Sequence, residues 1–417
     1  MIGVLLSRYK AFATFFSFSV ATSALGFGAS LLLMRLIMPA EFGKLAIFLS
    51  MQFLVAPIVS LSADNLIAIN KTRLDETSYA HFRRTYVTLA YAIFGVVELA
   101  FCVVYALDLQ QEVLLLLVPV AALLKFLIGL ASIEYVMEEK SVQYGLVQFF
   151  TTALSLALTV VFIWTVSADA GSRIFGLILA DLVFLLIRYR GRMRLLVPLP
   201  VKLADCSKIA LFGFPLLMSV APAWALNEAD KIIVSRYADL QAAGIYAAAC
   251  AIGNFMVTFN TSLLNSILPK LYAALARETD ILSVTRHFML RFLLISAAFA
   301  AVFLAAYALL ASRILPVKYV DARPVVYWII VLALARSLYA VLGAVTDYLG
   351  LTVQKLVGIS AGAVAALAGI YLGIQHFGVV GAAFGVGAGY TVLALVLWFC
   401  LMAKARSARA AVERCEK

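Results

Sequence analysis

The amino-acid sequence predicts an all-α membrane protein with many spanning helices. Of its 417 residues, 65% are hydrophobic and only 13% are charged, whereas soluble domains carry roughly 25% charged residues. Apolar stretches of about 20 residues recur along the chain, and each is long enough to cross the roughly 30 Å hydrocarbon core of a bilayer. The sequence lacks the alternating pattern of membrane β-strands. We therefore expect a polytopic α-helical protein.

About twelve spans are expected, in two lobes of six. Their approximate limits are 11–35, 43–67, 85–107, 112–135, 141–166, 173–189, 208–236, 242–268, 286–312, 323–347, 353–375 and 378–403. The segment 208–236 is longer than a span requires, so it should be tilted or kinked at Pro215 and Pro222. The predicted parts are an N-terminal lobe over 1–195, a cytoplasmic linker over 196–207, a C-terminal lobe over 208–403 and a basic cytoplasmic tail over 404–417.

The net charge of +11 is explained by membrane topology rather than by nucleic-acid binding. Lys and Arg are concentrated in the loops that fall on one side of the expected spans, and this side is the cytoplasmic one. Both termini are therefore predicted to lie in the cytoplasm, with the protein in the inner membrane. The N-terminal apolar stretch is expected to be a first span, because no small-residue cleavage site follows it.

An internal repeat suggests that the two halves are related. Residues 35–43 read RLIMPAEFG and residues 236–244 read RYADLQAAG, about half the chain apart. The Arg and Gly have the same spacing in both copies, and an Ala follows three residues after each Gly. This arrangement predicts two similar halves.

Charged residues within the predicted spans are the main functional signal. Glu98, Lys125, Asp181 and Arg336 lie inside spans, and each would cost about 2.5–3.5 kcal/mol at the bilayer centre. They should therefore pair with one another, for example Glu98 with Lys125, or face an interior cavity. Asp64 and Asp347 are expected near the inner ends of their spans.

The functional interpretation of these charges is a cavity that accepts an anionic group. Lys125, Arg336 and Arg35 would bind the substrate, because Arg can donate two parallel hydrogen bonds to a phosphate. Glu98 or Asp230 would bind a coupling cation or balance the charge. Whether each residue serves this role or a structural ion pair stays open at the level of sequence.

No cofactor, metal site or catalytic residue is expected. Neither the five cysteines nor the three histidines have the spacing of metal ligands, and the chain has no nucleotide-binding Gly–Lys–Ser/Thr loop. The glycines Gly381, Gly385 and Gly389 recur every four residues, which predicts a face for close helix packing. Without ATP hydrolysis, energy for transport would have to come from an ion gradient, the membrane potential or consumption of the product.

Several local motifs resemble those of a known family. They are Phe214-Pro215, Asn227-x-x-Asp230-Lys231, Gly244-Ile245-Tyr246, Pro39-x-x-x-Gly43 and Gly378-x-x-Gly381-Ala382-Ala383. Together with the two six-span halves, they resemble the polysaccharide (O-antigen type) flippase family of the multidrug/oligosaccharidyl-lipid/polysaccharide exporter superfamily. The resemblance covers the whole chain, and the span count is that of polysaccharide flippases.

This resemblance implies two six-helix lobes around a cleft that opens alternately to either side of the membrane. It implies an undecaprenyl-diphosphate-linked oligosaccharide as the substrate, membrane lipids as surroundings and polysaccharide polymerase machinery as a partner. Lys125 and Arg336 would offset the diphosphate charge, and Asp230 aligns with the acidic residue of the family's Asp–Arg/Lys pair. The first half departs from the second because Ala29 occupies the position equivalent to Asp230.

Three alternatives stay open. A multidrug/cation antiporter of the same superfamily should favour acidic cavity residues, whereas Lys and Arg are predicted here. A membrane polysaccharide polymerase or ligase would need a large outer loop, and the predicted loops are short. A membrane scaffold without transport activity would have little use for charges inside its spans.

Overall fold

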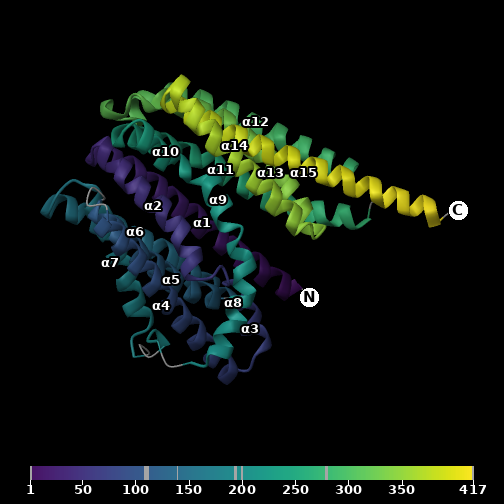
Figure 1. Ribbon diagram of the computed structural model, residues 1–417, viewed down its shortest axis with the longest axis horizontal. Coiled ribbons are helices and arrows are strands. Elements are labelled where there is room, and N and C mark those ends of the chain that lie inside the picture. The colour runs from purple at the N-terminus through teal and green to yellow at the C-terminus, as the bar shows by residue number, and fades with distance from the viewer. Residues whose placement is uncertain are drawn as a thin grey trace. The chain divides into compact units, whose positions relative to one another are not determined.

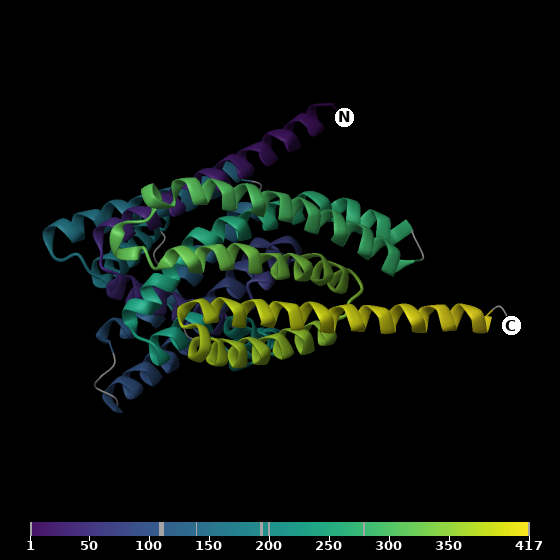
Figure 2. The same ribbon diagram turned by 90° about the horizontal axis from the view of Figure 1, so that it is seen from above.

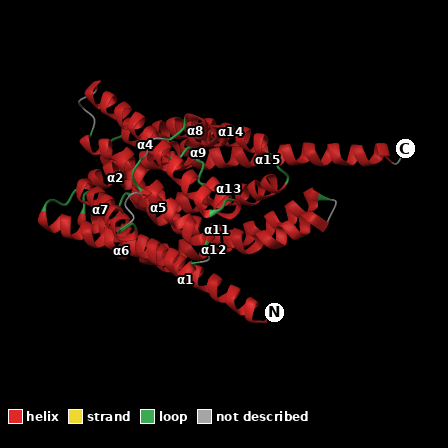
Figure 3. Cartoon of the chain, turned by 90° about the horizontal axis from the view of Figure 1, so that it is seen from below, coloured by secondary structure: helices red, strands yellow, loops and turns green. Residues whose placement is uncertain are grey.

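The computed structural model describes residues 2–107, 112–138, 140–191, 195–198, 201–277 and 280–415. Throughout these ranges the secondary structure is helical and contains no strand (Figure 3). The chain divides into two compact units, Met1–Ala221 and Pro222–Lys417, called unit 1 and unit 2 below. Each unit is described by itself.

Unit 1 is a bundle of antiparallel helices connected by short turns (Figure 1). Its elements are α1 (Ile2–Leu36), α2 (Pro39–Val59), α3 (Asn65–Arg73), α4 (Glu76–Leu107), the 3₁₀ turn η1 (Val113–Leu117), α5 (Val118–Met137), α6 (Ser141–Thr165), α7 (Ala170–Arg188) and α8 (Leu203–Leu217). Helix α6 packs against α1 and α7, and α5 packs against α2. The division between the units falls within α9 (Val220–Asn227).

Unit 2 contains longer helices. Its elements after α9 are α10 (Ala229–Tyr237), α11 (Leu240–Arg277), α12 (Ile281–Ile314), the 3₁₀ turn η3 (Val317–Tyr319), α13 (Ala322–Tyr348), α14 (Thr352–Phe377) and α15 (Val379–Cys415). Helix α13 packs against α11, α12 and α15, and α14 lies alongside α15. Helix α15 continues beyond the end of α14 toward the C-terminus (Figure 2).

The predicted all-α polytopic fold is confirmed. Within the described ranges, 11 helical stretches are long and apolar enough to cross a membrane, and the apolar part of α1, Ala21–Leu36, is a shorter candidate. Every predicted span overlaps one of these helices. The predicted basic tail begins as a continuation of α15, and the end of the predicted linker, from Leu203 onward, is already part of α8.

The second predicted span, 43–67, is shorter than expected. Helix α2 ends at Val59, and a tight turn precedes α3. In this turn Leu61 and Ser62 have φ angles of 52° and 50°, a left-handed conformation that side chains other than Gly seldom adopt. Gly213 of α8 approaches the same turn so closely that a Cβ would lie 2.3 Å from the Leu61 carbonyl oxygen. A hydropathy pattern cannot detect this reversal because the turn itself is apolar.

The long segment 208–236 is broken into three helices, as its prolines suggested. Helix α8 ends at Leu217, shortly after Pro215, and α9 begins at Val220, just before Pro222. A second interruption falls at Glu228, between α9 and α10. The residues around this second interruption carry the polar groups described below.

The predicted glycine face of the last span is confirmed as a packing surface. A Cβ on Gly381 would lie 1.9 Å from the carbonyl oxygen of Gly373, and one on Gly385 would lie 2.1 Å from the amide nitrogen of Ile370. The backbones of α14 and α15 therefore touch without intervening side chains, which is the close approach that small residues permit in membranes.

Candidate functional site

A cavity of about 600 Å³ lies within unit 1. It is bounded by the end of α2, the turn before α3, α3 itself, the second half of α5 and the first turns of α6. Its lining combines apolar side chains with hydroxyl, amide and charged groups, and the polar ones are Ser60, Asp64, Asn65, Lys125, Ser132, Tyr144, Gln148 and Thr151. The volume falls within the range of roughly 300–1,000 Å³ that is typical of small-molecule sites.

Lys125 reaches this cavity from α5 and holds a carboxylate behind it. Its Nζ lies 2.9 Å from Oδ2 and 3.0 Å from Oδ1 of Asp181 on α7. The Lys125 side chain is 44% exposed, whereas that of Asp181 is 4% exposed. Arg173, one α7 face away, donates to the hydroxyls of Ser155 and Thr159. Lys125 is thus a cation with one side paired and the other open to the cavity.

The opposite wall of the cavity carries Asp64. Its carboxylate accepts hydrogen bonds from the hydroxyls of Ser60, at 3.3 Å, and Tyr86, at 3.4 Å. Burial raises the pKa of the Asp64 carboxyl above its ordinary value, and the two hydroxyls oppose that rise. Ser132, on α5, is 6% exposed, and its hydroxyl has no hydrogen-bond partner among the described residues.

The expected ion pair between Glu98 and Lys125 is wrong. Lys125 pairs with Asp181 instead, because both side chains project between α5 and α7. Glu98 lies on α4, and its Oε2 is buried without a hydrogen-bond partner in the described part of the chain. Sequence separation along two spans did not reveal which helix faces which.

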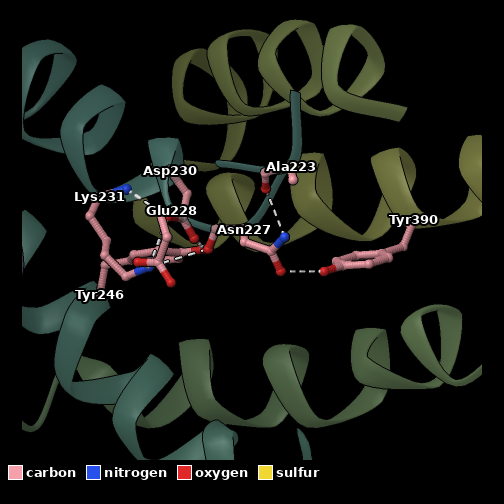
Figure 4. Close-up of polar contacts among 7 residues, drawn as sticks. All are labelled: Ala223, Asn227, Glu228, Asp230, Lys231, Tyr246 and Tyr390. Carbon is pink, nitrogen blue, oxygen red and sulfur yellow. Dashed lines mark hydrogen bonds and ion pairs between the residues drawn. The ribbon is translucent and has the colours of Figure 1, made fainter. Parts of the chain in front are cut away.

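In unit 2, the interruption between α9 and α10 brings a group of charged side chains together (Figure 4). Asp230 is 4% exposed. Its Oδ2 accepts a 2.8 Å hydrogen bond from the Tyr246 hydroxyl of α11, and its Oδ1 accepts from the Lys231 amide. The Lys231 Nζ lies 2.8 Å from Glu228 Oε2 and 3.2 Å from Asp230 Oδ1. We call Glu228, Asp230, Lys231 and Tyr246 the acidic-lysine cluster.

A second set of contacts extends from the same interruption toward α15 (Figure 4). The Asn227 amide donates to the Ala223 carbonyl at 2.7 Å, and its Oδ1 accepts from the Tyr390 hydroxyl at 2.6 Å. The Arg336 guanidinium of α13 lies over the Tyr390 ring, 5.4 Å from its centroid, in the range of a cation–π interaction. Among the described ion pairs Arg336 has no carboxylate partner.

The predicted site residues therefore fall into separate places. Lys125 lies on the cavity of unit 1, with Glu98 of the same unit outside its lining. Arg35 is an exposed residue in the last turn of α1. Asp230 and Arg336 belong to unit 2, where Asn227 and Tyr390 lie beside them.

Sequence reasoning missed one buried ion pair in unit 1. Arg83 is 4% exposed and its Nε lies 2.9 Å from Oε1 of Glu134. The Arg83 guanidinium also donates to the Leu195 carbonyl and the Tyr189 hydroxyl, and Tyr79 donates to Glu134. Arg83 had been counted as a loop charge that fixes topology. The available signal was the acidic Glu134 near the end of an apolar span.

No group of His, Cys, Asp and Glu among the described residues is arranged to hold a metal ion. The charged sites consist of ion pairs and hydrogen bonds. Their chemistry is that of binding through hydroxyl, amide, ammonium and guanidinium groups.

Comparison with known proteins places the chain in a family. Residues 32–324 match the family described as polysaccharide biosynthesis protein, and because this match covers most of the chain, the protein belongs to that family. No curated protein matches the chain in sequence.

Solved structures define the fold more broadly. A lipid II flippase MurJ in an inward closed conformation is similar with a TM-score of 0.65 and 13% identity, covering 93% of this chain and 87% of that one. A multidrug resistance MATE family transporter of the MOP superfamily, in an inward-facing conformation, gives 0.64 and 14%, covering 94% and 96%. A Vibrio cholerae MATE transporter, VcmN, gives 0.57 and 15%, covering 96% and 98%. The expected flippase-family membership and superfamily fold are confirmed.

Proposed function

We propose that this protein is a flippase that moves an undecaprenyl-diphosphate-linked oligosaccharide across the cytoplasmic membrane during polysaccharide biosynthesis. The observation that carries the proposal is Lys125, a lysine 44% exposed on a polar cavity inside a spanning bundle, in a member of the polysaccharide biosynthesis family. A charged side chain is retained within a membrane span at a free-energy cost, which a ligand-binding role explains.

The proposed mechanism is alternating access. Two lobes of six helices would rock around a cleft, so that the sugar and diphosphate cross while the lipid tail stays in the bilayer. The MurJ and MATE structures with the same fold include inward-facing and outward-facing forms of a MATE transporter, which supports a fold able to adopt both. Both termini would lie in the cytoplasm, and the product would pass to polymerase machinery outside.

The proposed roles of the charged residues follow from their surroundings. Arg336 supports diphosphate binding best, because it is a guanidinium beside an aromatic ring with no carboxylate in its described ion pairs. Arg35 and Lys125 are further proposed substrate contacts. Glu98 is the better candidate for a coupling cation, because one carboxylate oxygen has no described partner, and Asp230 the better candidate for charge balance.

The test is the leaflet location of the lipid-linked glycan in cells that lack this protein. We expect the glycan to accumulate on the cytoplasmic face and to reach the outer face again after re-expression. A glycan that still crosses but is not polymerised would favour the polymerase alternative. If neither transport nor polymerisation changes, drug export by a multidrug antiporter becomes the assay to run.

A further inference from the structure

The cavity of unit 1 has a lining whose charge does not suit a phosphate group. Its charged residues, within the part of the chain that the structure describes, are Asp64 and Lys125. Lys125 is already paired with Asp181 at 2.9 Å, and Asp64 adds either no charge or one negative charge according to its protonation. Arg173 is not among the lining residues. A diphosphate transferred here from water would lose hydration without gaining an unpaired cation, which is unfavourable.

The remaining polar lining does suit an uncharged polyhydroxylated ligand. Asn65 and Gln148 present amides, each with a carbonyl acceptor and two N–H donors. Ser132 and Thr151 present hydroxyls, and Lys125 presents an ammonium on its open side. Such groups alternate donors and acceptors over a small space, as the hydroxyls and acetamido groups of a sugar do.

Ser132 gives an independent indication that a ligand belongs in this cavity. Its side chain is more than nine-tenths buried, and its hydroxyl has no partner among the described residues. Serines in helices commonly bond a carbonyl one turn earlier, as Thr151 does to Val147 in the same cavity wall. A buried hydroxyl left unpaired costs free energy, and a ligand hydroxyl or amide would satisfy it.

We propose that this cavity binds a neutral, hydroxyl- and amide-bearing sugar residue of the lipid-linked oligosaccharide, and that the diphosphate is held by cations outside it. The inference rests on the proposed flippase function and assigns a part of the substrate to unit 1. Lys125 then serves as a hydrogen-bond donor to the sugar, with Asp181 fixing its position, rather than as a counter-ion to phosphate. The predicted topology places the cavity at the inner end of the spans, where a substrate assembled in the cytoplasm would enter.

The experiment measures binding of three probes to the purified full-length protein in nanodiscs. The probes are undecaprenyl diphosphate carrying N-acetylglucosamine, undecaprenyl diphosphate without a sugar, and free N-acetylglucosamine. The variants Ser132→Ala and Gln148→Met remove lining groups with little change in volume. Matched controls are Ser262→Ala on α11, whose hydroxyl bonds its own helix, and Gln354→Met on α14, both exposed.

We expect each cavity variant to weaken binding of the sugar-bearing lipid roughly five- to tenfold, as loss of one hydrogen bond would. Binding of undecaprenyl diphosphate should not change, and the controls should match the wild type. Equal weakening of both lipids, or no weakening of either by both variants, would overturn the inference and leave the flippase proposal standing. A wild type that binds free N-acetylglucosamine as tightly as the lipid would also overturn it, whereas one that binds none of the probes would overturn the proposed substrate class itself.

Discussion

The Lys125–Asp181 pair of unit 1 and the acidic-lysine cluster of unit 2 both hold a lysine against carboxylates beside apolar helices. They differ in access: the Lys125 side chain is 44% exposed and that of Lys231 is 13% exposed. Lys231 also has two carboxylate partners, and its neighbour Asp230 receives a further hydrogen bond from Tyr246. The closed cluster has its polar groups satisfied within the protein, whereas the open pair retains a donor for a ligand.

If the comparison holds, the largest effect on stability comes from Asp230→Ala. This change leaves the Tyr246 hydroxyl unpaired in a buried position and removes one partner of Lys231. Breaking a buried, hydrogen-bonded charge arrangement typically costs about 3 kcal/mol or more. We expect a clearly lowered melting temperature and less folded protein, measured by thermal unfolding of the detergent-solubilised protein followed by size-exclusion chromatography.

Asp239→Ala is the matched control for that change, because this aspartate is exposed and caps the start of α11 through the Ala242 amide. It should cost about 1 kcal/mol or less. Should Asp230→Ala instead keep the wild-type melting temperature and abolish the ion dependence of transport, the cluster would be a coupling site and the comparison would fail.

Lys125→Ala should have the next largest effect, and it should act on transport. Loss of a hydrogen bond from a charged donor corresponds to roughly a tenfold or larger decrease in the rate of glycan export. The protein should remain in the membrane, since Lys125 lies at the edge of a cavity. Export of labelled glycan, normalised to the amount of folded protein, is the measurement.

The double variant Lys125→Met with Asp181→Asn separates ligand contact from helix packing. It removes both charges together, so no buried carboxylate is left without its partner. We expect near-normal folded protein and export as low as in Lys125→Ala. Wild-type export from the double variant would mean that the lysine serves only to neutralise Asp181.

Arg336→Ala tests the cation of unit 2, with an expected decrease in export of roughly fivefold. The guanidinium has no carboxylate in its described ion pairs, so its loss should leave no unpaired acid behind. Arg336→Lys keeps the charge without the planar fork and should recover only part of the activity. Full activity of Arg336→Ala at native expression would remove this residue from the proposed substrate site.

The sequence predicted the helices and their packing surfaces better than it predicted the charge partners. Spans follow from the length of apolar stretches, and the Gly381 and Gly385 face follows from a four-residue spacing, so both depend on local pattern. The partner of Lys125 depends on which helices face one another across unit 1. The spacing along the chain gives Glu98 and Asp181 the same standing, and only tertiary packing selects Asp181.

The limits of the prediction are similar at the cavity. Asp64 was placed at the end of a span, but the left-handed turn at Leu61 and Ser62 turns the chain back and makes it a cavity wall. Arg83 looked like one more cytoplasmic charge, yet it is buried against Glu134. In both places a short-range irregularity or a long-range pair decided the outcome, and neither leaves a periodic signal in the sequence.

Tyr390→Phe is the smallest change that tests the comparison. It removes only the hydroxyl that donates to Asn227 and keeps the ring under Arg336. Loss of one hydrogen bond between neutral groups should lower the free energy of unfolding by about 1 kcal/mol and leave export close to wild type. Tyr390→Leu removes the ring as well and should reduce export toward the Arg336→Ala level, because the cation–π contact positions the guanidinium. If Tyr390→Phe alone reduced export that far at an unchanged melting temperature, the hydroxyl itself would contact substrate, and unit 2 would contain an open site of its own.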